Sequence, residues 1–228
     1  MSDSTSAVHV LKHHFADMEQ QSETSSFGMW VFLVTEIMFF GGLFAAYLIY
    51  RVLYFDSFAA ASTSINVVWG TINTAVLICS SLTMAMAVYS AQLGRKKALI
   101  SFLCLTMLLG SVFLGIKGKE YYDKFEENHV PGPHYHFVIE PEMAQRFHAI
   151  DPQKTEIFFS LYFIMTGLHA THMIVGFGLL IWLLIRSMRN EFGATYYTPI
   201  ELFGLYWHFV DIVWIWLYPL LYLIDRHH

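Results

Sequence analysis

The chain has 228 residues with a formal net charge of −5, and 56% of its residues are hydrophobic, 17% aromatic and only 14% charged. This composition excludes an ordinary soluble domain, and the lack of a basic stripe excludes nucleic acid as a predicted partner. Five apolar segments occupy more than half of the chain, at residues 27–50, 66–89, 97–116, 157–185 and 202–224. Backbone polar groups in lipid must be satisfied internally and alternation of period two is absent, so each segment is predicted to be a transmembrane helix. We therefore expect an all-α integral membrane bundle of five helices within residues 27–224.

Residues 1–26 are polar and mostly acidic, and they lack the basic start and small-residue cleavage site of a signal peptide. We interpret them as an uncleaved tail. The three histidines in this stretch raise the alternative of a metal site, but scattered histidines in an acidic, Ser-rich tail are more typical of solvent-exposed chain. The three are His9, His13 and His14.

The first apolar segment carries an acid well inside the bilayer, Glu36, about nine residues from its start. Its helical neighbours, such as Phe32 and Phe40, offer no hydrogen-bond partner, so the partner must be water or lie on another helix. Two interpretations stay open for Glu36. It is either a structural carboxyl, neutral or hydrogen-bonded at a helix interface, or a proton-linked carboxyl.

The second segment is rich in small and hydroxyl side chains, including Ser80, Ser81 and Thr83, which favour close helix packing and interhelical hydrogen bonds. It also holds Cys79, and the third segment holds Cys104. These cysteines form no CxxC or CxxCH pattern, so neither a disulfide framework nor attached c-type haem is indicated. We expect both to be small core residues.

Residues 117–156 form the only long predicted loop, because four prolines break helices there and eight acidic residues make it polar. We place it outside the membrane. Its four histidines could in principle bind a metal, but without a cysteine or a spaced acidic partner a partner-contacting loop is the favoured interpretation. They are His129, His134, His136 and His148.

The fourth and fifth segments each carry a polar pair three residues apart, His169 with His172 and His208 with Asp211. An aspartate near the middle of a membrane helix costs at least roughly 2.5 to 3.5 kcal/mol on insertion scales, so each pair must face protein. A bis-histidine haem is disfavoured, since two histidines three apart on one helix cannot bind opposite faces of one iron. Interhelical hydrogen bonds, involving Glu36 or Asp211, are favoured instead.

The distribution of Lys and Arg predicts the orientation of the chain. With the N-terminus in the cytoplasm, the short inside turns hold most of these residues: Arg95, Lys96, Lys97, Arg186 and Arg189. The loop 117–156 and the short C-terminus, residues 225–228, then lie outside. Four tryptophans near segment ends are expected to be interfacial anchors: Trp30, Trp69, Trp182 and Trp207.

Motifs in four segments point to one family. They are Thr35-Glu36 followed by IMFFGG, Glu120-Tyr121-Tyr122, Thr166-Gly167 followed by LHATH, and the run YWHFVD from Tyr206 to Asp211 followed by Val213-Trp214. In this order they resemble subunit III of haem–copper terminal oxidases, the cytochrome c oxidase family, in its bacterial five-helix form. Seven-helix members have two further helices before the one that carries Glu36, where this chain has its polar tail.

The resemblance implies a complex that reduces oxygen to water and moves protons across a bacterial inner membrane. It implies haems and copper in subunits I and II, a subunit III without a redox centre or metal of its own, and a possible bound phospholipid. Expected partners are subunits I and II, membrane lipids, and cytochrome c or quinol as the donor. The implied role is to stabilise subunit I and sustain proton uptake, with no catalytic residue in this chain. The residues carried over are Glu36, Glu120, His169, His172, His208 and Asp211.

Other interpretations remain open at this stage. A quinol oxidase subunit III and the accessory protein of nitric oxide reductases lie within the same superfamily, where donor and gas are decided by partner subunits. A small proton or ion transporter would use the intramembrane acids as a relay, but no internal repeat between the halves supports it. A stand-alone b-type cytochrome would carry haem by itself.

Overall fold

The computed structural model describes residues 15–127, 129–133, 135–139, 146–147, 150–194 and 196–223. Its helices are α2 (Met18–Leu53), α3 (Phe55–Thr63), α4 (Val67–Gln92), α5 (Lys96–Glu126), α7 (Pro152–Met188) and α8 (Thr198–Tyr222). All but α3 are long and apolar enough to cross a membrane, which gives five candidate spans. The predicted all-α membrane bundle is therefore confirmed.

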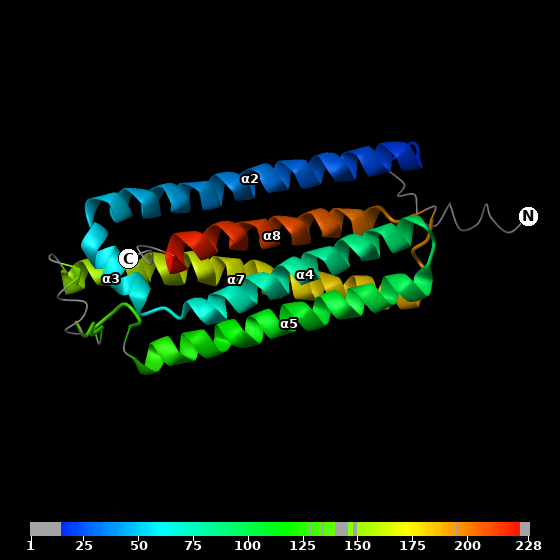
Figure 1. Cartoon of the computed structure of the whole chain (residues 1–228). Coiled ribbons are helices and arrows are strands. Elements are labelled where there is room, and N and C mark those ends of the chain that lie inside the picture. Colours follow the sequence, from blue (N-terminus) through cyan, green and yellow to red (C-terminus); the bar gives the residue numbers. More distant parts are fainter. Residues whose placement is uncertain are drawn as a thin grey trace, which may run out of the picture.

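The five long helices lie side by side, alternating in direction (Figure 1). At one end, the N-terminal end of the bundle, α2 begins, α4 turns into α5, and α7 turns into α8. At the opposite end, the α3 end of the bundle, lie α3, the connection between α5 and α7, and the end of α8. The turn that holds Arg95, Lys96 and Lys97 thus shares an end with the start of the chain.

Three helices begin at a residue whose side chain caps the first turn. Asp17, Asn66 and Asp151 each accept a backbone N–H of the following turn, at the starts of α2, α4 and α7. Such caps satisfy donors that the helix itself leaves free. Because of the Asp17 cap, residues 18–26, which the sequence placed in the polar tail, are already helical.

Helix α5 continues ten residues beyond the predicted end of its apolar segment, to Glu126. The continuation is charged, but its inward-facing groups neutralise one another at i,i+3 spacing: Lys117 lies 3.2 Å from Glu120, and Lys124 pairs with Glu127. The predicted loop 117–156 is therefore too long, and the connection between α5 and α7 covers residues 127–151. His134 and His148 lie outside the described residues.

The short helix α3 was not predicted from the sequence. Its alanine-rich stretch is almost completely buried from Ser57 to Ser62. The Ser62 hydroxyl donates to the carbonyl of Leu221 at 3.0 Å, and Ser57 Oγ accepts the backbone N–H of Asp151, also at 3.0 Å. Helix α3 thus joins the end of α8 to the start of α7 and closes this end of the bundle.

Helices α8 and α2 occupy opposite positions in the packing. In its most apolar window, 61% of α8 is buried, against 17% of α2. Helix α8 lies among the others, whereas α2 lies at the edge (Figure 1). The buried residues of α2 are Leu33, Phe40 and Tyr47. They are seven residues apart and so form a stripe along the side of α2 that faces the bundle.

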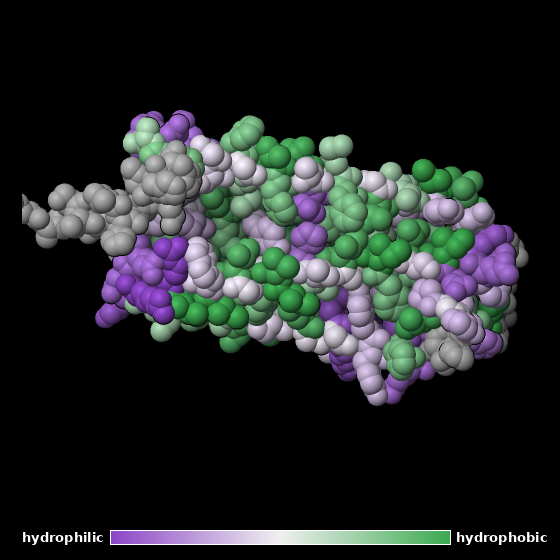
Figure 2. All heavy atoms as spheres, turned by 180° about the vertical axis from the view of Figure 1, so that it is seen from behind, coloured by the Kyte–Doolittle hydropathy of each residue, from purple (hydrophilic) through white to green (hydrophobic). Residues whose placement is uncertain are grey.

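The outer face of the bundle has an apolar middle and hydrophilic ends, as expected for a protein that crosses a bilayer (Figure 2). Two expectations about single residues are wrong. Cys79 and Cys104 are exposed on this outer face and are not core residues. Trp207 is not an interfacial anchor but is completely buried, with its indole N–H donating to Ser80 Oγ at 3.1 Å.

Candidate functional site

The intramembrane acid of α2 meets a histidine of α7. Glu36 Oε2 lies 3.1 Å from His172 Nε2, and their side chains are 20% and 18% exposed. The second ring nitrogen, Nδ1, lies 2.9 Å from the carbonyl oxygen of Leu168. The ring of Phe40 packs against the imidazole at a centroid distance of 5.5 Å. The predicted partner on another helix is therefore His172.

These hydrogen bonds determine where protons can reside. A carbonyl oxygen only accepts, so Nδ1 of His172 carries a proton and donates it to Leu168. At the other side of the ring, either a protonated Glu36 donates to Nε2, or a doubly protonated His172 donates to the Glu36 carboxylate. Either group can therefore be the donor in this hydrogen bond.

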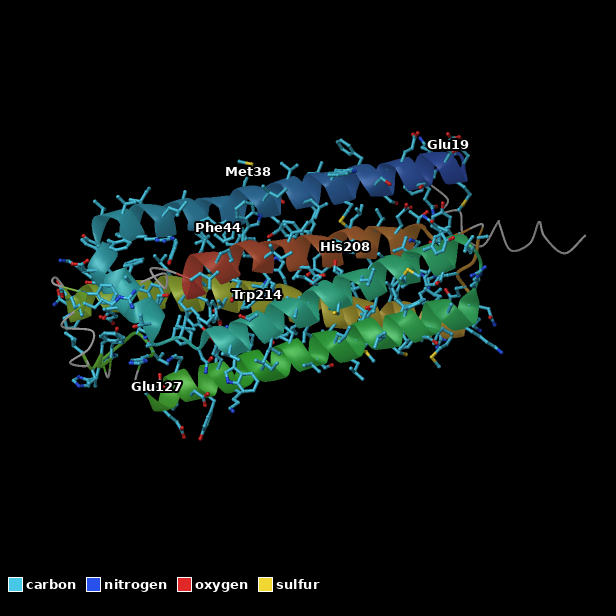
Figure 3. The ribbon with its side chains drawn as sticks, viewed as in Figure 1. Glu19, Met38, Phe44, Glu127, His208 and Trp214 are labelled. Atoms are coloured by element: carbon cyan, nitrogen blue, oxygen red, sulfur yellow. The ribbon has the colours of Figure 1, made fainter. Side chains whose placement is uncertain are left out.

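The polar pair of α8 faces α4. His208 Nδ1 and Ser81 Oγ are 2.6 Å apart, and Figure 3 labels His208 on this side of α8. Asp211, one turn along, is 2% exposed. Ser81 is also the polar side chain beside Asp211, although no partner among the described residues lies within hydrogen-bonding distance of either carboxyl oxygen.

His169 differs from the other two histidines. It is buried, and neither ring nitrogen has a hydrogen-bond partner in the described part of the chain. Its imidazole lies edge-on to Phe113 at a centroid distance of 5.4 Å and tilted against Trp214 at 5.2 Å. The structure therefore separates His169, in an aromatic core, from His172, paired with Glu36, although they are three residues apart.

Glu120 belongs to a cluster at the α3 end that joins three helices. Its Oε1 accepts the hydroxyls of Tyr162, at 2.6 Å, and of Tyr222, while Oε2 lies 3.2 Å from Lys117 Nζ. Lys117 Nζ also donates to Tyr162 Oη at 3.1 Å and to Tyr222 Oη at 2.9 Å. The rings of Tyr162 and Trp214 lie 5.1 Å from the ammonium. We call Lys117, Glu120, Tyr162 and Tyr222 the α5–α7–α8 clamp.

The clamp was only partly visible in the sequence. Glu120 was expected to matter, but Lys117 was assigned to the loop and the two tyrosines were not singled out. The signal that could have found Lys117 is its spacing of three residues before Glu120, which puts both charges on one helix face.

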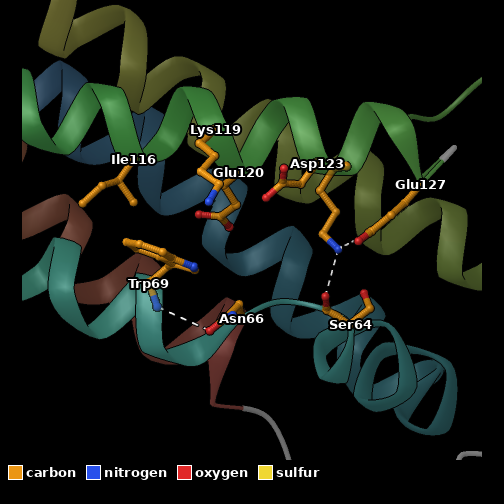
Figure 4. A pocket seen from close by; sticks show the side chains of 9 residues that line it. Ser64, Asn66, Trp69, Ile116, Lys119, Glu120, Asp123 and Glu127 are labelled. Atoms are coloured by element: carbon orange, nitrogen blue, oxygen red, sulfur yellow. Dashed lines mark hydrogen bonds and ion pairs between the residues drawn. The ribbon is translucent and has the colours of Figure 1, made fainter.

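A polar cavity of about 220 Å³ lies beside the clamp, between α5 and the junction of α3 with α4 (Figure 4). Acids and lysines of α5 line one side, and Trp69 lines the other, with Lys119 Nζ 5.1 Å from its ring centroid. Lys124 closes the edge by donating to the carbonyl of Ser64 at 2.8 Å. Through this cavity the buried Glu120 borders the outer surface.

A second hollow is almost wholly apolar. It has a volume of about 380 Å³ and lies between the first half of α2 and the facing parts of α7 and α8. Met29, Phe32, Trp182 and Tyr206 are among its lining residues. Its apolar lining suits an acyl chain more than a polar ligand.

Outside the spans, the connection after α5 holds a buried imidazole. His129 stacks on Phe159 at a centroid distance of 4.9 Å, and its Nδ1 lies 3.0 Å from Glu127 Oε2. Burial and the nearby Lys124 ammonium lower the pKa of His129 below its usual value. Burial likewise raises the pKa of Tyr135 to about 12. The side chains of His129 and Tyr135 are therefore both uncharged at neutral pH.

Comparisons with known proteins agree with this architecture. The sequence model of the family described as cytochrome c oxidase subunit III matches residues 9–127 and 144–225. The chain belongs to the cytochrome c oxidase subunit III family. All six residues expected to matter lie within the matched ranges, whereas part of the connection between α5 and α7 does not.

Named members of the subunit III family are similar over most of their length. A probable cytochrome c oxidase subunit 3 from Nocardia farcinica is 32% identical over 199 residues, which cover 87% of each chain. The cytochrome c oxidase subunit 3 of Thermostichus vulcanus is 30% identical over 200 residues, again 87% of each chain. A quinol oxidase subunit 3 from Bacillus spizizenii is 31% identical over 220 residues, which cover 92% of this chain and 93% of that one.

The described residues of this subunit III family member contain no group of three or more His, Cys, Asp and Glu side chains arranged to hold a metal ion. The intramembrane histidines have other partners instead: His172 bonds Glu36, His208 bonds Ser81, and His169 packs among aromatic rings. These contacts join α7 to α2 and α8 to α4.

Proposed function

We propose that this chain is the non-redox subunit III of a proton-pumping haem–copper oxygen reductase, a cytochrome c oxidase. In this role it stabilises subunit I and sustains proton uptake during aerobic respiration. Family membership over most of the chain supports the assignment to the oxidase. The oxygen chemistry then belongs to haems and copper held by partner subunits.

The Glu36–His172 pair is the observation that carries the proton-linked part of the proposal. The two side chains lie 3.1 Å apart between α2 and α7, and both are partly exposed. A buried pair of no net charge can gain and lose a proton without leaving two unpaired ions in the bilayer. We assign Glu36 and His172 a proton-linked role, Glu120 and His169 a structural role, and His208 and Asp211 a role in helix association.

The proposed partners are subunits I and II, membrane lipids, and cytochrome c as donor to the complex. A bound phospholipid fits the apolar hollow between α2, α7 and α8, with an acyl chain along Phe32 and Trp182. The quinol oxidase relative from Bacillus spizizenii supports quinol as the alternative donor. An accessory role in a nitric oxide reductase has no comparable support.

The proposed location is the bacterial inner membrane, with the N-terminal tail in the cytoplasm. The basic turn at Arg95, Lys96 and Lys97 lies at the N-terminal end of the bundle, and this bias supports that end as the cytoplasmic one. The α3 end, the connection between α5 and α7, and residues 225–228 are then outside.

The test is to purify the tagged full chain from mild-detergent membranes and record a reduced-minus-oxidised visible spectrum of the product. We expect haem a or o bands, two larger co-purifying polypeptides, and oxygen uptake driven by reduced cytochrome c. Uptake driven only by quinol would select the alternative donor. A colourless chain isolated alone would contradict the proposal and favour a transporter, and a haem b band without partners would favour a stand-alone cytochrome.

A further inference from the structure

The polar cavity between α5 and the junction of α3 with α4 holds one cation and one anion without an ionic partner among the described residues. Five of its lining residues are charged: Lys119, Glu120, Asp123, Lys124 and Glu127. Lys117 of the clamp neutralises Glu120 at a distance of 3.2 Å. Lys124 likewise pairs with Glu127. The Lys119 ammonium and the Asp123 carboxylate remain, and neither makes an ion pair or hydrogen bond in the part of the chain that the structure describes.

Two neutral donors line the same cavity. Asn66 Oδ1 accepts the backbone N–H groups of Val68 and Trp69, whereas Asn66 Nδ2 has no partner among the described residues. The indole N–H of Trp69 is likewise unpaired within the described chain. The Lys119 ammonium lies 5.1 Å from the centroid of the Trp69 ring, so donors from α4 and α5 meet at this cavity (Figure 4). The cavity therefore combines several donors for an anion with one carboxylate for a cation.

The level of the two charges relative to the membrane selects the class of ligand. The predicted apolar segment of α5 ends at Ile116, and Lys119 is the first exposed charged residue after it. Asp123 lies one turn further, about 6 Å along the helix axis toward the α3 end. The cation is therefore nearer the hydrocarbon and the anion nearer the water. A phospholipid with an ethanolamine head has the matching order of groups: acyl chains, then the phosphate, then the terminal ammonium.

An apolar strip continues from the cavity along the bundle. On α5, Ile116 lines the cavity and Val112 is four residues before it, on the same side of the helix. On α4, Ile72 is three residues after Trp69. Val112 and Ile72 are 42% and 41% exposed, so acyl chains can lie against them. The cavity itself, at about 220 Å³, is smaller than the roughly 300 to 1,000 Å³ of clefts for drug-sized ligands and suits a head group alone.

We propose that this cavity binds the phosphoethanolamine head of a membrane phospholipid, with its phosphate on Lys119 and Trp69 and its ammonium on Asp123. Asn66 Nδ2 supplies a further donor to the phosphate. A glycerol head has no cation for Asp123, and the quaternary ammonium of a choline head has no N–H to donate. The site is separate from the apolar hollow beside α2. The inference goes beyond the proposed function, because it needs the membrane bundle but not the oxidase.

The first experiment joins the lipid to its carboxylate. The tagged full chain, with any subunits that co-purify, is placed in vesicles of equal parts dioleoyl phosphatidylethanolamine and dioleoyl phosphatidylglycerol and treated with a carbodiimide. The reagent activates a carboxylate, and the amine of a bound lipid then forms an amide bond and releases a urea. We expect mass spectrometry to find this adduct on Asp123. The internal control is Glu126, an exposed acid of α5 that lines none of the described pockets, and it should stay unmodified.

The second experiment compares two variants that each remove one negative charge from α5. Asp123→Asn removes the partner of the ammonium, and Glu126→Gln removes a charge from outside the cavity. After extraction from the same vesicles, native mass spectrometry counts the lipids retained. We expect the parent and Glu126→Gln to retain about fivefold more phosphatidylethanolamine than phosphatidylglycerol, and Asp123→Asn to retain the two equally. Lys119→Met should lower the retention of both lipids, because it removes the cation that binds either phosphate.

Three results would overturn the proposal: no lipid adduct on Asp123, equal retention of the two lipids by the parent, or the same lipid ratio in both single variants. Soluble phosphoethanolamine is the last arm. It lacks acyl chains, so an excess of it should leave the adduct on Asp123 unchanged. Loss of the adduct would assign the cavity to a soluble phosphate ester and overturn the lipid. No readout depends on haem, oxygen uptake or partner subunits, so these results are distinct from a failure of the proposed function.

Discussion

Two buried polar regions of the bundle differ in how their carboxyl groups are hydrogen-bonded. In the α5–α7–α8 clamp, Glu120 has three partners and Lys117 lies among tyrosine hydroxyls and aromatic rings. Between α4 and α8, Asp211 is buried to the same degree but makes no hydrogen bond within the described residues. The two carboxyl groups are therefore similarly buried and differ in the hydrogen bonds that they make within the chain.

This difference bears on the stability of the bundle. A charge that its own chain fully satisfies stabilises the packing of that chain, and breaking the set leaves an isolated ion in a medium of low dielectric. A buried carboxyl that makes no hydrogen bond within its own chain adds no such stabilisation, and its lost hydration is a cost to the fold. The comparison predicts a graded series of effects.

The largest effect is expected for Lys117→Met. It leaves Glu120 buried without its cation, so the free energy of unfolding should fall by about 3 to 5 kcal/mol. Unfolding in mixed micelles, followed by tryptophan fluorescence, measures the change. The matched double variant Lys117→Met with Glu120→Leu should recover most of it. A single variant no worse than the double one would show that the two groups are not energetically coupled.

A smaller effect is expected at Glu36, where the pair is partly exposed. Glu36→Leu removes the hydrogen bond to His172 and should cost about 1 to 2 kcal/mol of the free energy of unfolding. Glu36→Gln keeps a donor to Nε2 of His172, so its stability should stay within about 0.5 kcal/mol of the parent. It cannot exchange the proton, however, and should slow oxygen turnover of the complex. Unchanged turnover across a broad pH range would leave Glu36 a structural role only.

The His129 contact should respond weakly to acid. Its folded-state pKa lies below the usual value of about 6.5, so the contact is complete at neutral pH and is lost as the pH falls through the folded-state value. Lys124 and His136 oppose its protonation and Glu127 favours it. We expect local opening of residues 129–139 to become easier by about 1 kcal/mol or less below pH 6.5.

Hydrogen exchange at several pH values measures this opening. The matched variant is His129→Phe, which keeps the stacking on Phe159 and cannot be protonated. Its protection should not change over the same pH range. An equal pH response in both proteins would mean that another group controls the connection.

The smallest effect on the isolated chain is expected for Asp211→Leu. No hydrogen bond within the chain is lost, so the free energy of unfolding should change by about 0.5 kcal/mol or less. The same unfolding assay as for Lys117→Met gives a direct comparison. A loss as large as that of Lys117→Met would show that Asp211 has a strong partner inside its own chain and would remove the contrast between the two regions.

The sequence was sufficient for the parts of the fold that depend on composition. Five apolar stretches of membrane length predict five helices, and the motif around Glu36, His172 and Asp211 predicts the family. It also predicted that the partner of Glu36 is water or lies on another helix, and the structure places His172 of α7 there. What it could not provide was the neighbour of each polar group, because residues far apart in the chain meet only when helices pack.

The remaining errors have the same physical origin. Charged residues normally end a span, so Lys117 was assigned to a loop. In the structure Glu120 neutralises its charge, and the hydroxyls of Tyr162 and Tyr222 accept its hydrogen bonds. Trp207 was placed at an interface because it lies near a segment end, but α8 lies inside the bundle and buries it. An alanine-rich nine-residue helix such as α3 is too short to give a clear periodic pattern.

Helix α2 is attached to the bundle at several points along its length. Near the α3 end, the Tyr47 hydroxyl donates to the carbonyl of Leu220, and α3 follows directly. The first half of α2 borders the apolar hollow, and Met38 of α2 projects away from the bundle (Figure 3). From Tyr47 the helix runs about 16 Å to Glu36 and about 44 Å to Met18. Leu33, Phe40 and Tyr47 hold α2 against the bundle along about 21 Å of its length, so the Glu36–His172 pair lies within the packed part of the helix.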